Sequence, residues 1–264
     1  RDRFTTQVKL IDAVEKTGSK ARRFIVQTGE SLYYNQDGEL VCRAHGSTAR
    51  IPRARAEGGL KYQPREAHRY TDEELADIGA AIEAEARRAA TPRFWEDVSV
   101  GDVAQPVVKG PLNITDMICW YSGGGHTYQA LERAYRHRKR HPADAFRDSK
   151  TGAQDSAARG HAEKEMAREV GMPGGYDVGP QRVSWLGHLM TNWAGDDGFI
   201  RRLQVQVKRP NIFGDVSWCR GKVVDKRIED GIPLVELELA IENQLGETTA
   251  DGSSIVELPS RNKP

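Results

Sequence analysis

Loosely alternating hydrophobic and polar residues occupy three runs near the start of the chain, at 4–11, 23–34 and 39–51. Alternation of this kind is typical of strands that bury one face. The Asp37-Gly38 dipeptide between the last two runs is a hairpin signal, because glycine adopts the positive φ angles that a tight turn requires. The pattern therefore predicts three consecutive antiparallel strands over residues 4–51.

A linker and a helix follow these strands. Residues 52–70 combine proline, glycine and many charges, which indicates a surface segment. Thr71 and Glu74 have the spacing of a capping box, and they open a helix rich in Ala, Glu and Arg that extends to about Ala89. This helix carries few large apolar residues, so we expect it to lie on a surface as a connector.

The hydrophobic pattern restarts at Phe94. An apolar helix at 115–121 leads into a glycine-rich turn, and a second apolar helix covers about 183–193. Between them, 127–141 is basic and helical, and 142–180 is polar and punctuated by glycine and proline, which indicates an insertion. Four strands are expected at the end of the chain, at 199–209, 215–226, 234–243 and 247–258.

Two of these strand-rich regions form an internal repeat. Residues 8–18 resemble 222–231, and 35–39 resemble 243–247. The second copy is preceded by a helix that its sheet can wrap, whereas the first copy has no such helix ahead of it. A three-stranded sheet with one bare apolar face is marginally stable in water. We therefore expect that upstream residues or another subunit complete the first copy.

These patterns divide the chain into three parts. Residues 1–52 are expected to be the closing strands of a first unit, 53–93 a linker with the surface helix, and 94–264 a second unit with the insertion at 142–180. The length of 264 residues and the 38% hydrophobic content are enough to bury a core.

Charge and hydropathy narrow the range of partners. The 39 Lys and Arg residues nearly balance the 38 Asp and Glu residues, so the chain lacks the positive field of a dedicated nucleic-acid binder. No stretch approaches the roughly 20 apolar residues of a membrane span, and the first residues have no signal-peptide core. We expect a cytoplasmic protein with neither a nucleic-acid nor a membrane partner.

The spacing of cysteine and histidine argues against a metal centre. Cys42, Cys119 and Cys219 are odd in number and far apart, which fits neither a disulfide framework nor a CxxC-type site. His137 and His141 have the spacing of helical ligands, but the four Arg and Lys residues around them would repel a metal ion. We expect three reduced thiols and no metal site.

Three segments, 94–102, 110–117 and 240–247, together resemble the MaoC-like acyl dehydratases, specifically the group with a fatty-acid-synthase-type dehydratase domain at the N-terminus. The resemblance covers about 94–258, and 4–51 resembles the remnant of a first copy. It implies an α+β, double hot-dog fold, in which bent antiparallel sheets each wrap a helix. The N-terminal hot dog is then incomplete in this chain.

The resemblance also implies a function. It indicates a hydro-lyase that reversibly hydrates a 2,3-enoyl thioester to a 3-hydroxyacyl thioester, with an acyl-CoA or acyl-carrier thioester as substrate and no cofactor. A homo- or hetero-oligomer would complete the first hot dog. Such chemistry needs an acid/base pair and a backbone N–H at a helix N-terminus that polarises the thioester carbonyl.

The expected acid/base pair is not preserved in this sequence. Family members take it from an Asp and a His five residues later, after a glycine at the start of the central helix. Counted from Asp116, these positions hold His126 and Leu131, and a register shifted by two residues gives Gly124 and Gln129.

His126 is the candidate acid/base, because histidine titrates near neutral pH. The alternative is a hydrogen-bonded helix cap after a glycine turn. Tyr128 is a second catalytic candidate, or else a packed aromatic residue. Four residues just before His126 are expected to bind the thioester oxygen through backbone N–H groups: Ser122, Gly123, Gly124 and Gly125.

Other residues have two interpretations each. His161 with Glu163 is either a pair that reaches over the pocket or a solvated histidine on a polar helix. His188 lies in an apolar helix, where a satisfied core histidine is usual. The basic run 136–141 is either a solvated face or a contact for the phosphates of CoA. The same fold leaves two other functions open, a hot-dog thioesterase and a non-catalytic acyl-CoA-binding subunit of a heteromeric hydratase.

Overall fold

The chain forms two compact units, residues 1–63 and 64–264. The computed structural model describes residues 2–18, 23–50, 62, 65–124, 131–142, 145–148, 150–169 and 171–262. Among these residues, no helix is long and apolar enough to cross a membrane.

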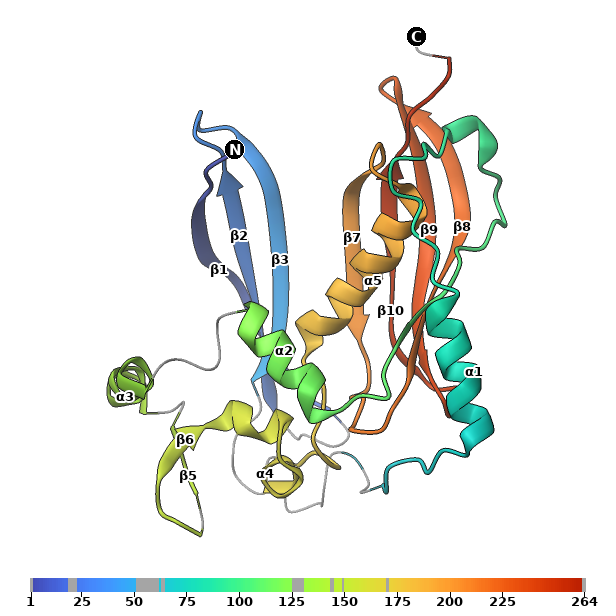
Figure 1. The fold of residues 1–264 in the computed structure, drawn as a ribbon. Coiled ribbons are helices and arrows are strands. Elements are labelled where there is room, and N and C mark those ends of the chain that lie inside the picture. The colour runs from blue at the N-terminus through green and yellow to red at the C-terminus, as the bar shows by residue number, and fades with distance from the viewer. Residues whose placement is uncertain are drawn as a thin grey trace. The chain divides into compact units, whose positions relative to one another are not determined.

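The first unit is an antiparallel sheet of three strands, drawn in blue in Figure 1. The strands are β1 (Thr5–Lys16), β2 (Phe24–Tyr34) and β3 (Leu40–Arg50), and β2 lies in the middle. Gly38 has φ of 80° in the turn between β2 and β3, as the Asp-Gly signal predicts. Every residue of β1 and β3 is exposed, and none of the described residues of this unit forms a helix.

The second unit contains a five-stranded antiparallel sheet that curls around one helix (Figure 1). The helix is α5 (Gly179–Ala194), which contacts all five strands. The strands, in their order across the sheet, are β4 (Val107–Lys109), β8 (Ser217–Glu229), β9 (Ile232–Asn243), β10 (Thr248–Glu257) and β7 (Phe199–Val207). This is the hot-dog arrangement that the resemblance to the MaoC-like dehydratases implies.

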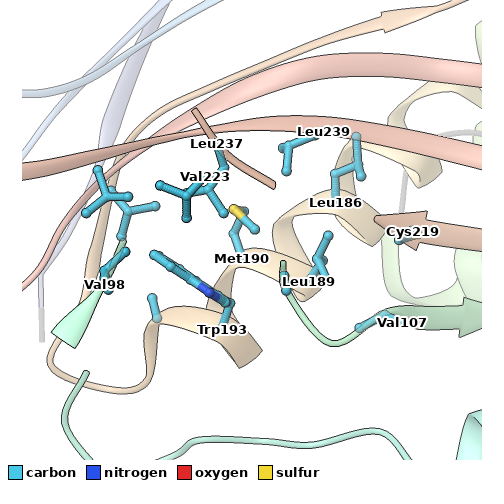
Figure 2. Packing of buried hydrophobic residues seen from close by; sticks show 14 of the residues in the cluster. Val98, Val107, Leu186, Leu189, Met190, Trp193, Cys219, Val223, Leu237 and Leu239 are labelled. Carbon is cyan, nitrogen blue, oxygen red and sulfur yellow. The ribbon is translucent and has the colours of Figure 1, made fainter. Parts of the chain in front are cut away.

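The core of the second unit lies between α5 and the concave face of this sheet (Figure 2). Its helical side consists of buried residues at the spacing of one helix face: Leu186, Leu189, Met190 and Trp193. They point toward Val223, Leu237 and Leu239 of β8 and β9 in Figure 2. Pro180 suits the first turn of α5, and Gly195, with φ of 78°, ends the helix.

The helix that the sheet wraps is therefore the one expected at 183–193, not the one expected at 115–121. The latter is α2 (Ile114–Gly124), whose Ile114 and Ile118 are 42% and 58% exposed. Spacing counted from Asp116 on α2 thus does not lead to the start of the central helix. That start is Gly179.

The two units repeat one another in register as well as in sequence. The shift in pairing between β1 and β2 falls at Leu10–Asp12, and that between β8 and β9 falls at Val223–Asp225. A second shift occurs where Tyr33–Tyr34 and Ile241–Glu242 meet the third strand of each unit. Bulges re-aim side chains and bend a strand, so a shared pair of them gives both sheets the same local geometry.

The connector helix is α1 (Asp72–Glu83), which ends earlier than the expected Ala89. Its capping box is present, since Thr71 Oγ1 accepts from the N–H of Glu74 at 3.2 Å and Glu74 Oε2 accepts from the N–H of Thr71 at 2.7 Å. Ile78 is its one fully buried residue and packs with Val108 and Val216. The helix lies on the surface, as predicted.

The expected insertion at 142–180 contains its own short elements rather than one long loop. They are β5 (Ala145–Arg147), β6 (Gln154–Ser156), the 3-10 helix η3 (Ala157–His161) and α4 (Lys164–Glu169). The basic helix before it is α3 (Leu131–Arg140), and a 3-10 turn, η1 (Trp95–Asp97), lies at the start of the unit.

Candidate functional site

A histidine at the end of η3 forms the centre of the candidate site. Ser156 opens this turn, because its Oγ accepts from the N–H of Ala158 at 3.2 Å. Arg159 stabilises the turn, because its Nε donates to Glu163 Oε1 at 2.6 Å and its Nη1 donates to Asp148 Oδ2 at 2.5 Å. These bonds fix the backbone that carries His161.

The hydrogen bond of His161 determines which ring nitrogen can act as a base. Nδ1 lies 3.0 Å from the carbonyl oxygen of Tyr176. A carbonyl only accepts hydrogen bonds, so we assign the proton of the neutral ring to Nδ1. Nε2 is then the proton acceptor. The ring lies between two tyrosines, with centroids 4.0 Å from Tyr176 and 6.3 Å from Tyr121.

The surroundings favour the neutral form of this imidazole. Burial lowers the pKa of His161, and the hydrogen bond to Tyr176 and the charge of Asp177 oppose that shift only in part. Because the pKa falls below the ordinary value for histidine, the ring is uncharged at neutral pH. An uncharged histidine with a defined acceptor nitrogen is suited to general-base work.

The segment that holds His161 continues into the central helix. Tyr176 forms a bridge to Ile212, and the carbonyl of Gly175 accepts from the N–H of Phe213 at 2.9 Å. A Cβ on Gly175 would lie 2.8 Å from the Phe213 ring, so only glycine fits there without a shift. α5 begins at Gly179; Pro180 has no N–H and the N–H of Gln181 donates to the Val178 carbonyl at 3.0 Å, so this helix end offers the N–H of Gly179 and the helix dipole. They provide a positive helix end close in sequence to the acceptor of His161.

Apolar and aromatic side chains form one wall beside this histidine. Tyr121, which contacts the His161 ring edge-on, belongs to a cluster with Leu112 and Met117, and all three are buried. Further members of the cluster are Trp120, Val178 and Phe213. Such a wall reduces water access and strengthens electrostatic interactions nearby.

The residues predicted from the sequence lie elsewhere or outside the described part of the chain. Ser122 and Gly123 are exposed in the last turn of α2, and Gly124 is its final residue. Gly125, His126 and Tyr128 lie outside the described residues. Their roles remain predictions.

The interpretation of His161 as a solvated histidine was wrong. Its ring is mostly buried, and Glu163 bonds Arg159 rather than the imidazole. No local sequence pattern indicates that His161 is buried and bonded, because the carbonyl that accepts its hydrogen bond lies fifteen residues later in the chain.

His188 has the partners expected of a satisfied histidine, but it is 29% exposed rather than a core residue. Lys109 Nζ lies 2.8 Å from its Nδ1, and Glu85 Oε1 lies 2.9 Å from its Nε2. Since the ammonium can only donate, Nε2 carries the ring proton and donates to Glu85. The three side chains link the residues after α1 to β4 and α5.

Within the described ranges, no group of three or more His, Cys, Asp or Glu side chains is placed to hold a metal ion. His137 and His141 have ring centroids 4.7 Å apart on the basic stretch that ends α3. Arg136 on this stretch pairs with Glu132 at 2.6 Å and is 67% exposed, which fits a largely solvated face.

Comparison with solved structures identifies proteins that share this fold. No family model and no curated protein matches this sequence. A solved MaoC-like dehydratase is similar over 98% of this chain and 70% of its own, with 14% identity and a TM-score of 0.64. A putative MaoC domain protein dehydratase from Chloroflexus aurantiacus is similar over 99% and 71%, with 14% identity and a TM-score of 0.54.

The fold is that of the MaoC-like dehydratases. Both solved structures extend over both units of this chain. The MaoC-like fold accounts for the repeat of β1–β3 in β8–β10, and for a sheet that wraps α5.

Proposed function

We propose that this protein reversibly hydrates a 2,3-enoyl thioester to a 3-hydroxyacyl thioester, with an acyl-CoA as substrate and His161 as the acid/base. The observation that carries the proposal is the neutral, tautomer-fixed imidazole of His161, held by the segment that opens the central helix. Two structures with this fold are described as dehydratases, which supports the reaction class.

The dehydration direction needs one proton to leave carbon 2 and hydroxide to leave carbon 3. His161 Nε2 takes the proton from carbon 2, and negative charge develops on the thioester oxygen. An N–H in the first turn of α5, at Gly179, stabilises that charge. The carbon–oxygen bond at carbon 3 then breaks, the double bond forms, and the imidazolium returns its proton to the departing hydroxide to give water. Hydration is the reverse.

A comparison of histidine variants tests this assignment. His161→Ala should lower kcat/KM by about 100-fold or more, the usual contribution of general acid–base catalysis, as measured by the absorbance of the enoyl thioester. His188→Gln is the matched control, because glutamine retains a donor toward Glu85, and it should keep full activity. Loss of activity in His126→Ala but not in His161→Ala would return the role to His126.

The same assay separates the alternative functions. A thiol reagent detects free CoA, so release of CoA together with the free acid, and with no hydroxyacyl thioester formed, would assign a thioesterase. An inactive but acyl-CoA-binding chain would assign a non-catalytic subunit.

We further propose that a second copy of this chain covers the β1–β3 sheet. Leu10 pairs with Gly29 as Val223 pairs with Leu237, so the corresponding face of β8–β10 is the one that α5 covers. Leu10 is 62% exposed, whereas Val223 is 1% exposed. The other face of the first sheet is polar, since Glu30 there bonds Lys9 at 2.9 Å and also contacts Arg43 and His45.

Light scattering after size exclusion tests this association. The native chain should elute as a dimer or larger, and Leu10→Arg, which places a charge on the apolar face, should shift it toward the monomer. Gln7→Arg lies on the polar face and should leave the assembly intact. A native monomer would overturn the proposal.

A further inference from the structure

A buried ion pair lies directly beside the segment that holds His161. Asp177 and Arg182 have side chains 0% and 2% exposed. Arg182 Nε and Nη2 donate to Asp177 Oδ2 and Oδ1 at 2.5 and 2.6 Å. Asn211 adds two donors to the same carboxylate, its backbone N–H at 3.2 Å and Nδ2 at 3.1 Å. The carboxylate is thus fully hydrogen-bonded.

The guanidinium extends this network to the sheet. Arg182 Nη1 donates to the carbonyl of Thr249 at 2.7 Å and to the carbonyl of Arg209. The pair therefore joins the segment before α5, the first turn of α5, the residues after β7 and the start of β10. Four stretches of backbone meet at one pair of side chains.

Stability alone gives no reason for such a pair. Removing two charges from water costs several kcal/mol per ion, and well-packed apolar residues of similar volume are often as stabilising or more so. What an ion pair adds is fixed geometry, because a bidentate fork admits only one relative orientation. The backbone it fixes runs from the Tyr176 carbonyl, which binds His161, to Gly179, which opens α5.

We propose that Asp177 and Arg182 are positioning residues for His161. The pair holds the Tyr176 carbonyl and the first turn of α5 in one fixed relation, and the Asp177 carboxylate acts electrostatically on the imidazole. This inference rests on the proposed role of His161 in the reaction, although its physical part, the coupling to the imidazole, can be measured without the reaction.

The charged groups around this imidazole are few, and the Arg182 guanidinium is paired with Asp177 itself. The neighbouring rings are those of Tyr121 on α2 and of Tyr176, and burial raises the pKa of Tyr176. On its own turn, Arg159 and Glu163 bond each other. Within the described residues, the Asp177 charge is the nearby electrostatic influence on the pKa of His161, and it raises that pKa against the larger effect of burial.

The variant Asp177→Asn tests both parts of the inference. Removing the negative charge should lower the pKa of His161 further, because only the hydrogen-bond contributions then oppose the effect of burial. NMR titration of labelled histidine measures this directly, with His161→Gln to assign the signal. The acid limb of the pH profile of kcat/KM should move to lower pH by the same amount. Loss of geometry should reduce kcat by about 10-fold or more while KM changes little.

The control is Glu242→Gln, which breaks the exposed pair with Arg220 on β8 and β9 and should change neither readout. An unchanged His161 titration in folded Asp177→Asn would overturn the electrostatic coupling. If that variant does not fold, Arg182→Lys keeps the charge and loses the fork, and a native kcat in it would overturn the positioning role. Full activity in His161→Gln would instead refute the proposed function, while the titration still decides the coupling.

Discussion

Replacing Gly175 with alanine should damage the site from a distance, through the ring of Phe213. The added Cβ would lie 2.8 Å from Phe213 Cε2 and 3.0 Å from two other ring carbons. Contacts under 3.0 Å force a movement, and Phe213 is tied by its N–H to the carbonyl of the same Gly175. Overpacking of this kind typically costs about 1–3 kcal/mol. Each 1 kcal/mol lowers Tm by about 2–4 °C in a domain of this size.

The effect on activity should exceed the effect on stability. Gly175 directly precedes Tyr176, whose carbonyl fixes the tautomer of His161, so the strain is applied next to that hydrogen bond. A displacement of about 1 Å at a reacting group can cost about 100-fold in rate. We therefore expect Gly175→Ala to lower kcat by about 10- to 100-fold in an enoyl-thioester hydration assay, with a thermal melt that still shows a folded protein.

Two further variants test whether the contact with the Phe213 ring causes the loss. Gly174→Ala is the matched control, because a Cβ on Gly174 has no atom within 4 Å, and it should resemble the native protein. Phe213→Leu removes the ring edge that the new methyl group meets, so the double variant Gly175→Ala with Phe213→Leu should recover part of the lost kcat. A native Tm and kcat in Gly175→Ala would refute the argument, as would equal losses in both glycine variants.

Three further predictions follow from the packing and the charges. Leu189→Ala should destabilise the second unit by about 2–5 kcal/mol in chemical denaturation, since Leu189 is fully buried between α5 and the sheet. The hydrogen bonds of Glu30 to His45 and Lys9 lower its pKa to about 2. Its contribution to stability is therefore present above about pH 4.5 and is lost as the pH falls toward 2. Glu30→Gln should flatten that part of the acid unfolding curve. Burial raises the pKa of the Cys219 thiol to about 12, so a thiol reagent should modify the exposed Cys119 in the folded protein and reach Cys219 only after unfolding.

Local signals were sufficient for much of the fold. Alternation and the Asp37-Gly38 turn located β1–β3, and the Thr71–Glu74 spacing located the start of α1. In each case the determining interaction lies within a few residues, and these are the interactions that sequence patterns report. The repeat added the expectation of a sheet wrapped around a helix, which the second unit confirms.

The candidate site depended on contacts between distant parts of the chain. His161 bonds the carbonyl of Tyr176, and any backbone carbonyl can accept, so the sequence holds no mark of the partner. Asp177 and Arg182 are charged residues, which usually lie on the surface, yet both are buried because each satisfies the other. Neither fact follows from composition or spacing.

The sequence did not indicate which of the two apolar helices the sheet wraps. Both α2 and α5 contain enough apolar residues to read as core helices, so apolar content did not separate them. Their packing does, because Leu186, Leu189, Met190 and Trp193 of α5 lie in the core of the sheet, whereas α2 buries Met117 and Tyr121 in a separate cluster. The residues just before Gly179, at the start of α5, include Tyr176, whose carbonyl accepts the hydrogen bond of His161. The family spacing counted from Asp116 on α2 instead leads to His126.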